Sequence, residues 1–126
     1  MKIELRAFVL DCKDPHELAV FYAALLQGKI VYEDDEYAVV YPPKIKRGAN
    51  YPSITFQRNQ EYVPPVWPEE PGAQQQMAHL DFTVDNLEKA VEHAVHCGAK
   101  IATEQYSTRW TVLFDPVGHP FCLVQM

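Results

Sequence analysis

A βαβββ order of elements occurs twice along this chain of 126 residues, and this repeat constrains the fold more than any other feature. Residues 1–58 and 77–126 each show the pattern of a strand, a helix and three further strands. Three pairs of positions align between the repeats: Ala7 with His79, Asp14 with Asp85, and Gly28 with Gly98. Repetition of one supersecondary unit predicts a pseudo-symmetric α+β fold of two tandem βαβββ modules.

In the first repeat, residues 3–11 alternate in part between apolar and polar side chains, which predicts a strand. Asp14 and Pro15 suit the N-cap and first turn of a helix over about residues 15–27, and Gly28 suits a left-handed C-cap. The apolar stripe of this helix comprises Leu18, Phe21, Tyr22 and Leu25. The three following strands are predicted at residues 29–32, 37–41 and 53–57.

The second repeat begins with a strand predicted at residues 77–84. Asp85 and Glu88 have the spacing of a capping box, and Gly98 marks the expected end of the helix. The apolar stripe of this helix comprises Leu87, Val91, Ala94 and Val95. Three strands are predicted at residues 100–104, 110–114 and 121–125. The last two are joined by Asp115-Pro116-Val117-Gly118-His119, whose proline and glycine indicate turn architecture, not catalysis.

Residues 59–76 connect the repeats as a linker, and their prolines disfavour a helix or a central strand. We expect Tyr62 and Trp67 to order this linker by packing against the domain or against a second subunit. The length and the apolar content suit one domain over residues 1–126 that folds without disulfides.

The formal net charge of −6 argues against a nucleic-acid partner, because such binding depends on Lys and Arg that displace counterions. We interpret the basic cluster Lys44, Lys46 and Arg47 as a solvated loop. The sequence shows no leader-like segment and no apolar run near the roughly 20 residues of a membrane span. Three separated cysteines without a CxxC pair indicate neither a disulfide framework nor a thiolate zinc site, which predicts a cytoplasmic location.

Three motifs follow one another along the chain. The first motif combines Asp14-Pro15, Phe21-Tyr22 and Leu25-Leu26-Gln27-Gly28. The second is His79-Leu80-Asp81-Phe82. The third is Phe114-Asp115-Pro116-Val117-Gly118-His119, followed by Phe121-Cys122-Leu123-Val124. In order and spacing they resemble the vicinal oxygen chelate superfamily, the glyoxalase/bleomycin-resistance/dioxygenase fold, with His119 where an asparagine is usual. The resemblance implies two modules around a shared cavity, often in a dimer, and a divalent metal that polarises the substrate as a Lewis acid.

The resemblance also places metal ligands on the first strand and near the end of the last strand of each repeat. These positions fall here on Ala7, Gln57, His79 and Cys122. Alanine offers no donor atom and the neighbouring Arg6 would repel a cation, so His79 is the one good candidate ligand. We therefore predict no metal cofactor, with Mn, Ni, Zn or Fe open as the alternative.

Strand alternation places His79, Asp81 and Thr83 toward the cavity, and Leu80, Phe82 and Val84 toward the helices. In the first strand, the same rule places Ala7, Val9 and Asp11 toward the cavity, and Phe8, Leu10 and Cys12 beneath the helix. A carboxylate of Asp11 or Asp81 beside His79 would favour the protonated imidazole and orient it as a base or an anchor. The alternative is that both carboxylates simply meet solvent.

Cys122 is either a nucleophile, if a cation such as His79 lowers the pKa of its thiol, or a structural cysteine. Aromatic walls of a pocket are expected from Trp110, Tyr41, Tyr106 and Phe56, with core packing as the alternative. The predicted pocket residues are thus His79, Asp81, Gln57, Cys122 and Trp110.

These observations favour a homodimeric protein that binds a small molecule without chemistry and lacks the full metal site of the superfamily. The alternative is a metal-dependent lyase, isomerase or extradiol-type dioxygenase that uses His79 as a ligand. A third possibility is an interaction module in which the linker around Trp67 docks a partner. The fold alone does not decide among them, because this scaffold carries several chemistries.

Overall fold

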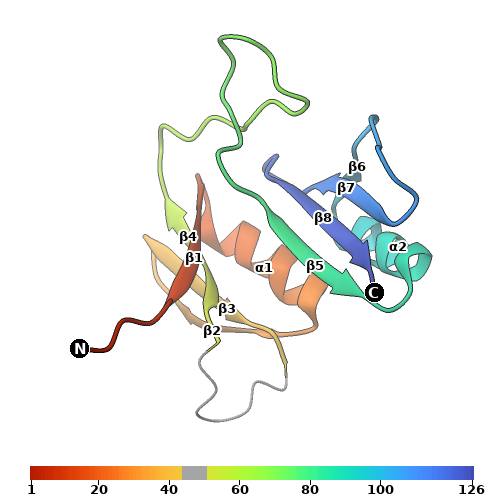
Figure 1. Ribbon diagram of the computed structural model, residues 1–126. Coiled ribbons are helices and arrows are strands. Elements are labelled where there is room, and N and C mark those ends of the chain that lie inside the picture. Colours follow the sequence, from red (N-terminus) through yellow and green to blue (C-terminus); the bar gives the residue numbers. More distant parts are fainter. Residues whose placement is uncertain (44–50) are drawn as a thin grey trace. The chain divides into compact units, whose positions relative to one another are not determined.

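The computed structural model describes residues 1–43 and 51–126 (Figure 1). The basic cluster Lys44, Lys46 and Arg47 lies outside the described residues, so its interpretation as a solvated loop stays a prediction. The chain forms two compact units, Met1–Tyr62 and Val63–Met126, and the boundary falls inside the predicted linker 59–76.

The described residues of the first unit form one helix and one four-stranded mixed sheet. Its elements are β1 (Ala7–Cys12), α1 (Pro15–Leu26), β2 (Lys29–Glu33), β3 (Tyr37–Tyr41) and β4 (Ser53–Arg58). The strand order is β1-β4-β3-β2, in which β1 runs parallel to β4 and the other neighbours are antiparallel. The chain returns from α1 through β2 and β3 to place β4 beside β1, as Figure 1 shows.

The second unit repeats this topology. Its elements are β5 (Leu80–Val84), α2 (Leu87–Cys97), β6 (Lys100–Ile101), β7 (Trp110–Phe114) and β8 (Pro120–Gln125). The strand order is β5-β8-β7-β6, again with the first and last strands parallel and the others antiparallel. The predicted α+β fold of two tandem βαβββ modules is therefore confirmed.

Helix α1 begins as the sequence predicts and supplies half of the buried hydrophobic residues described in its unit. The carboxylate of Asp14 accepts hydrogen bonds from the backbone N–H groups of His16 and Glu17, and Pro15 occupies the first turn. The ring of Tyr22 stacks on that of Phe56 from β4, with centroids 5.3 Å apart. The buried residues of α1 are Pro15, Leu18, Ala19, Phe21, Tyr22 and Leu25.

The end of α1 corrects the prediction for Gly28. The left-handed residue is Gln27, with φ 55°, and its N–H bonds back to the last turn. Gly28 is required for another reason, because a Cβ atom there would collide with the backbone carbonyl of Tyr41. The helix ends at Leu26, one residue earlier than predicted, and the chain then passes close to β3 at Gly28.

Helix α2 starts at a different cap from the one expected. Asn86 is the N-cap and its side chain accepts from the N–H of Lys89, whereas the backbone carbonyl of Asp85 accepts from the side chain of Gln125. Gly98 ends the helix as predicted, with φ 121°. Only Ala94 is fully buried in this helix, and Val95, placed on the apolar stripe, is 45% exposed.

Two strands of the second unit are shorter than predicted. Met77 has φ 61°, which interrupts the extended backbone, so β5 starts at Leu80 and His79 precedes it. Strand β6 covers only Lys100–Ile101, where residues 100–104 were expected. Among the described residues, no helix has the length and apolar character needed to cross a membrane.

Candidate functional site

The candidate site lies on one face of the sheet of the second unit. In β5, Asp81 and Thr83 are exposed and alternate with the half-buried Leu80, Phe82 and Val84. The ring of Phe82 contacts that of the fully buried Phe121. This pattern confirms the predicted alternation, and it leaves the polar side chains on the open face.

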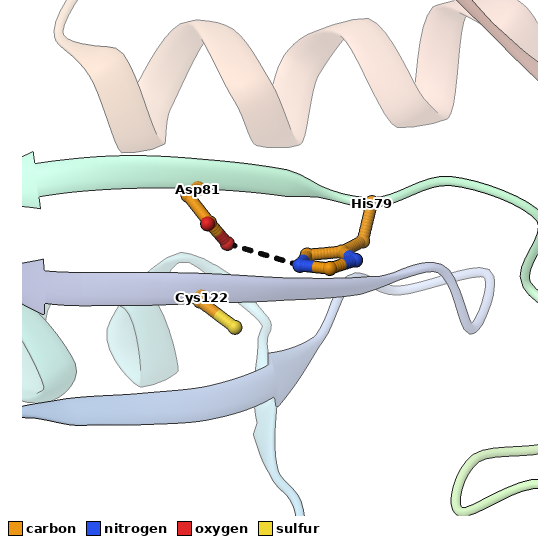
Figure 2. A group of neighbouring side chains, drawn as sticks. All are labelled: His79, Asp81 and Cys122. Atoms are coloured by element: carbon orange, nitrogen blue, oxygen red, sulfur yellow. Dashed lines mark ion pairs between the residues drawn. The ribbon is translucent and has the colours of Figure 1, made fainter.

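His79, Asp81 and Cys122 form a cluster on this face (Figure 2). Asp81 pairs directly with Cys122 across the parallel strands β5 and β8, and His79 lies two residues before Asp81. The Nε2 atom of His79 is 3.2 Å from Oδ1 of Asp81. One potential ligand atom from each of the three residues lies within 4.8 Å of the others. The side chains of His79 and Asp81 are 41% and 59% exposed, so solvent reaches the cluster.

The thiol of Cys122 is held in its neutral form. Burial, together with the negative charge of Asp81 and a hydrogen bond to it, raises the pKa of Cys122 to about 11. An activated nucleophile requires the opposite shift, so the hypothesis of a His79-activated thiolate is not supported. Burial is the largest cause of this raised pKa, and the carboxylate of Asp81 adds to it.

Beside the cluster, the same unit contains a hollow of about 180 Å³. Its lining residues are Trp67, Gln76, His79, Tyr106, Trp110, Val112, Pro120 and Cys122. Trp67 from the linker contacts the rings of Tyr106 and Phe114, with centroids 5.8 and 6.3 Å apart. The linker therefore packs on the unit through Trp67, as one of the two predicted alternatives stated.

The structure brings together several predicted pocket residues and separates others. His79, Cys122 and Trp110 line the hollow, and Asp81 joins the cluster at its edge. Phe56 is fully buried against Tyr22, so it is a core residue and the prediction of a pocket wall is wrong. Sequence reasoning missed Gln76, which lies in the linker where no strand period indicates its direction.

The predicted turn between β7 and β8 is structural. Oδ1 of Asp115 accepts hydrogen bonds from the N–H groups of Val117 and His119, and Gly118 has φ 98°. Asp115 is buried and belongs to the second unit. The turn fixes the start of β8, the strand that carries Cys122.

The first unit offers different side chains at the equivalent positions. Ala7 precedes its helix cap by seven residues, as His79 precedes Asn86. Two residues further on, Val9 is therefore the counterpart of Asp81. Val9 pairs with Thr55 on β4, and Asp81 pairs with Cys122 on β8. Thr55, and not Gln57, is therefore the counterpart of Cys122, an error of two residues in the predicted register. Gln57 as a pocket residue stays a prediction.

The four ligand positions that the resemblance implies thus fall on Ala7, Thr55, His79 and Cys122. Alanine has no donor atom, and the hydroxyl of Thr55 lies 3.0 Å from that of Ser53. This set does not fit the oxygen-rich coordination that magnesium or manganese requires. Asp11, also in the first unit, accepts a hydrogen bond from the side chain of Asn59, and its approach to His79 stays a prediction.

Two βαβββ modules with these registers define the vicinal oxygen chelate fold. A family model described as the glyoxalase-like domain matches residues 7–124. The chain therefore belongs to the glyoxalase-like domain family.

Solved structures with the same fold cover nearly the whole chain. One is a glyoxalase/bleomycin resistance protein/dioxygenase family enzyme from Burkholderia phytofirmans PsJN, with 16% identity, TM-score 0.70 and 98% coverage of both chains. The fosfomycin resistance protein FosX from Mesorhizobium loti has 13% identity and TM-score 0.67, with 98% of this chain and 92% of that chain covered. TnmS3, an antibiotic binding protein from Streptomyces sp. CB03234, has 15% identity and TM-score 0.64, with coverages of 98% and 96%. No curated protein matches the chain.

Proposed function

We propose that this protein binds a small molecule with a planar apolar ring in the hollow of the second unit. The observation that carries the proposal is that three aromatic side chains, Trp67, Tyr106 and Trp110, line one hollow beside polar groups. Pockets for small ligands combine apolar walls with a few placed polar groups in this way. The antibiotic-binding and resistance proteins among the structural neighbours are consistent with such a role.

The size of the hollow limits the ligand. An engineered apolar cavity of about 150 Å³ accommodates benzene. The hollow of about 180 Å³ therefore has room for one ring, so a larger ligand would extend beyond it. The amide of Gln76 and the imidazole of His79 offer hydrogen bonds to a polar substituent on that ring.

Tryptophan fluorescence tests this proposal, because both tryptophans of the chain line the hollow. We expect benzoate or catechol, added in the presence of EDTA, to change the emission saturably, and cyclohexanecarboxylate to bind at least severalfold more weakly. Trp110→Ala should weaken binding about tenfold, as the loss of an aromatic contact worth about 1.4 kcal/mol predicts. Tyr32→Ala, a substitution of an exposed tyrosine on β2, is the matched control and should leave the affinity unchanged.

Two results would contradict the proposal. Linear emission changes with every aromatic probe would show that the hollow does not bind a ring. Equal affinities of the wild type and the Trp110→Ala variant would place the ligand elsewhere. Trp67→Phe keeps an aromatic ring and leaves Trp110 as the single fluorescent reporter. This variant distinguishes a loss of the fluorescence change from a loss of ligand binding.

Metal-dependent catalysis is the second candidate function, and the clustering of donor atoms around His79 favours it. A lyase, isomerase or dioxygenase reaction would then depend on His79. Assays with a glutathione hemithioacetal and with catechol, each with Mn, Ni, Zn or Fe(II) supplied separately, test this function. Turnover that His79→Ala abolishes would support it, and no turnover with any of these metals would leave ligand binding alone.

We also propose that the chain forms a homodimer in the cytoplasm, as expected from the resemblance and from the cysteine pattern. Light scattering after size exclusion tests the dimer through its mass, against 14.5 kDa for one chain.

A further inference from the structure

The cluster of His79, Asp81 and Cys122 combines three chemically different donors on one open sheet face. A carboxylate oxygen from β5, a sulfur atom from the adjacent β8 and an imidazole nitrogen from the residue directly before β5 come together in one unit. The parallel register fixes Asp81 opposite Cys122, and the imidazole of His79, directly before β5, contacts Asp81 with its Nε2 atom 3.2 Å from Oδ1. The backbone therefore fixes Asp81 beside Cys122, and the contact of His79 with Asp81 completes the grouping.

From this grouping we propose that the second unit binds one zinc ion through His79, Asp81 and Cys122. The site keeps His79 and Cys122 from the ligand positions that the resemblance implies, and it differs in its third ligand, because Asp81 lies outside those positions and Ala7 and Thr55 cannot complete the usual set. The inference goes beyond the proposed binding of an aromatic molecule and needs no organic ligand.

The distances within the cluster suit a tetrahedral ion. Bonds of about 2.0 Å to nitrogen and oxygen place two ligand atoms about 3.3 Å apart in a tetrahedron. The distance of 3.2 Å between Nε2 of His79 and Oδ1 of Asp81 agrees with this value. A sulfur ligand with a bond of about 2.3 Å would lie about 3.5 Å from either atom. Because the three atoms lie within 4.8 Å and two of the side chains are partly exposed, small side-chain rotations reach this arrangement.

The donor set selects the kind of metal. A thiolate and an imidazole favour zinc over magnesium, calcium or manganese, which prefer oxygen ligands. The thiolate and the carboxylate together carry two negative charges, which neutralise a divalent cation. Three protein ligands leave a fourth position for water, as in zinc sites that are open to solvent. Binding must displace the thiol proton, so zinc uptake should acidify a weakly buffered solution.

Cobalt(II) provides a direct test in the full-length protein purified without a chelating tag. A thiolate ligand gives a sulfur-to-cobalt charge-transfer band in the near ultraviolet, and tetrahedral coordination gives intense visible bands. We expect both in the wild type, with a stoichiometry of one cobalt per chain and displacement by zinc. Cys122→Ser should abolish the charge-transfer band, and His79→Ala should weaken zinc binding at least about 100-fold, above the range for second-shell changes.

Two further variants keep the test decisive. Asp81→Asn changes an exposed side chain and should preserve the fold while it weakens zinc binding about 10- to 100-fold. Cys97→Ser is the matched control, because Sγ of Cys97 lies 3.7 Å from Nε2 of His93 on α2 and forms a competing thiol–imidazole pair. This variant should keep the full cobalt spectrum. Circular dichroism of each variant confirms that it is folded.

Several results would overturn the proposal. The absence of a charge-transfer band in the folded wild type would exclude thiolate coordination. A band that Cys97→Ser removes and Cys122→Ser retains would move the site to α2. Equal zinc affinities of the wild type and the Asp81→Asn variant would remove Asp81 from the ligand set. All of these measurements omit aromatic probes, so their failure does not affect the proposed ligand hollow.

Discussion

The two units share one topology and one strand register, yet they use their side chains differently. In the first unit, α1 buries five side chains besides Pro15, and the rings of Tyr22 and Phe56 stack in the core. In the second unit, Ala94 is the only fully buried residue of α2. At three equivalent positions, the first unit carries Ala7, Val9 and Thr55. The second unit carries His79, Asp81 and Cys122 there.

This difference shows that two modules with the same backbone topology can carry different functional side chains. The backbone of each module places three side chains on one face of its sheet, whatever those side chains are. In the first module, they are small or apolar, and they offer a cation at most one hydroxyl. In the second module, the same positions hold an imidazole, a carboxylate and a thiol. We conclude that the candidate site belongs to the second module, and that helix α1 of the first module mainly packs the core.

The largest expected effect concerns this contrast between the helices. Leu18→Ala removes a fully buried side chain of α1 and should lower the free energy of unfolding by about 3 kcal/mol, within the range for buried leucines. Val95→Ala on α2 changes a side chain that is 45% exposed and should cost less than about 0.5 kcal/mol. Urea unfolding followed by circular dichroism measures both values. Equal losses would show that the two helices are packed alike.

A transplant tests whether the shared register is sufficient to build the site. The variant Ala7→His, Val9→Asp and Thr55→Cys, combined with Cys122→Ser, moves the three donors to the first unit. We expect the sulfur-to-cobalt band lost in Cys122→Ser to return, with one cobalt per chain. If a folded variant with all four substitutions shows no band, the register alone does not define the site.

A smaller effect is expected for the reactivity of Cys122. Its pKa of about 11 keeps the thiol protonated at pH 8. A raised pKa lowers the fraction of thiolate and raises the intrinsic nucleophilicity of that thiolate, and the first effect is the larger. Alkylation of Cys122 should therefore be about 10-fold slower than that of a thiol with an unshifted pKa. Mass spectrometry after iodoacetamide treatment, native against urea-unfolded, measures this ratio. Faster alkylation of Cys122 in the native protein would instead support an activated nucleophile.

The smallest expected effect concerns a histidine–carboxylate pair of the first unit. A hydrogen bond to Glu33, at 2.7 Å, and the charge of Glu33 raise the pKa of His16. The pair therefore stabilises the folded state most below the ordinary histidine pKa, and this contribution disappears as the pH rises through the raised value. Nuclear magnetic resonance titration should show a lower pKa for His16 in Glu33→Gln. An unchanged pKa would show that the pair is not formed in solution.

The order of elements was predictable because local signals define it. Asp14 caps α1, Gly98 ends α2 and Asp115 holds its turn, each as the sequence indicates. The start of α2 was not predictable, because Asp85 and Asn86 are both good caps. Bonds of the distant Gln125 to the Asp85 carbonyl and to the N–H of Leu87 accompany the choice of Asn86.

The site was predictable only in part. Alternation identifies the face of His79 and Asp81, but a shift by two residues leaves the face unchanged, so Gln57 and Thr55 look equivalent in the sequence. The position of Trp67 depends on the path of the linker, which carries no period. Its contacts with Tyr106 and Phe114 therefore became visible only in the structure.

Anomalous diffraction at the zinc edge, from crystals of the full chain grown with zinc, would locate the ion in the proposed site of the second unit. We predict a peak in the second unit, within bonding distance of His79, Asp81 and Cys122, and no peak at Ala7 and Thr55. A zinc ion held instead by His93 and Cys97, or no bound zinc at His79, would contradict it.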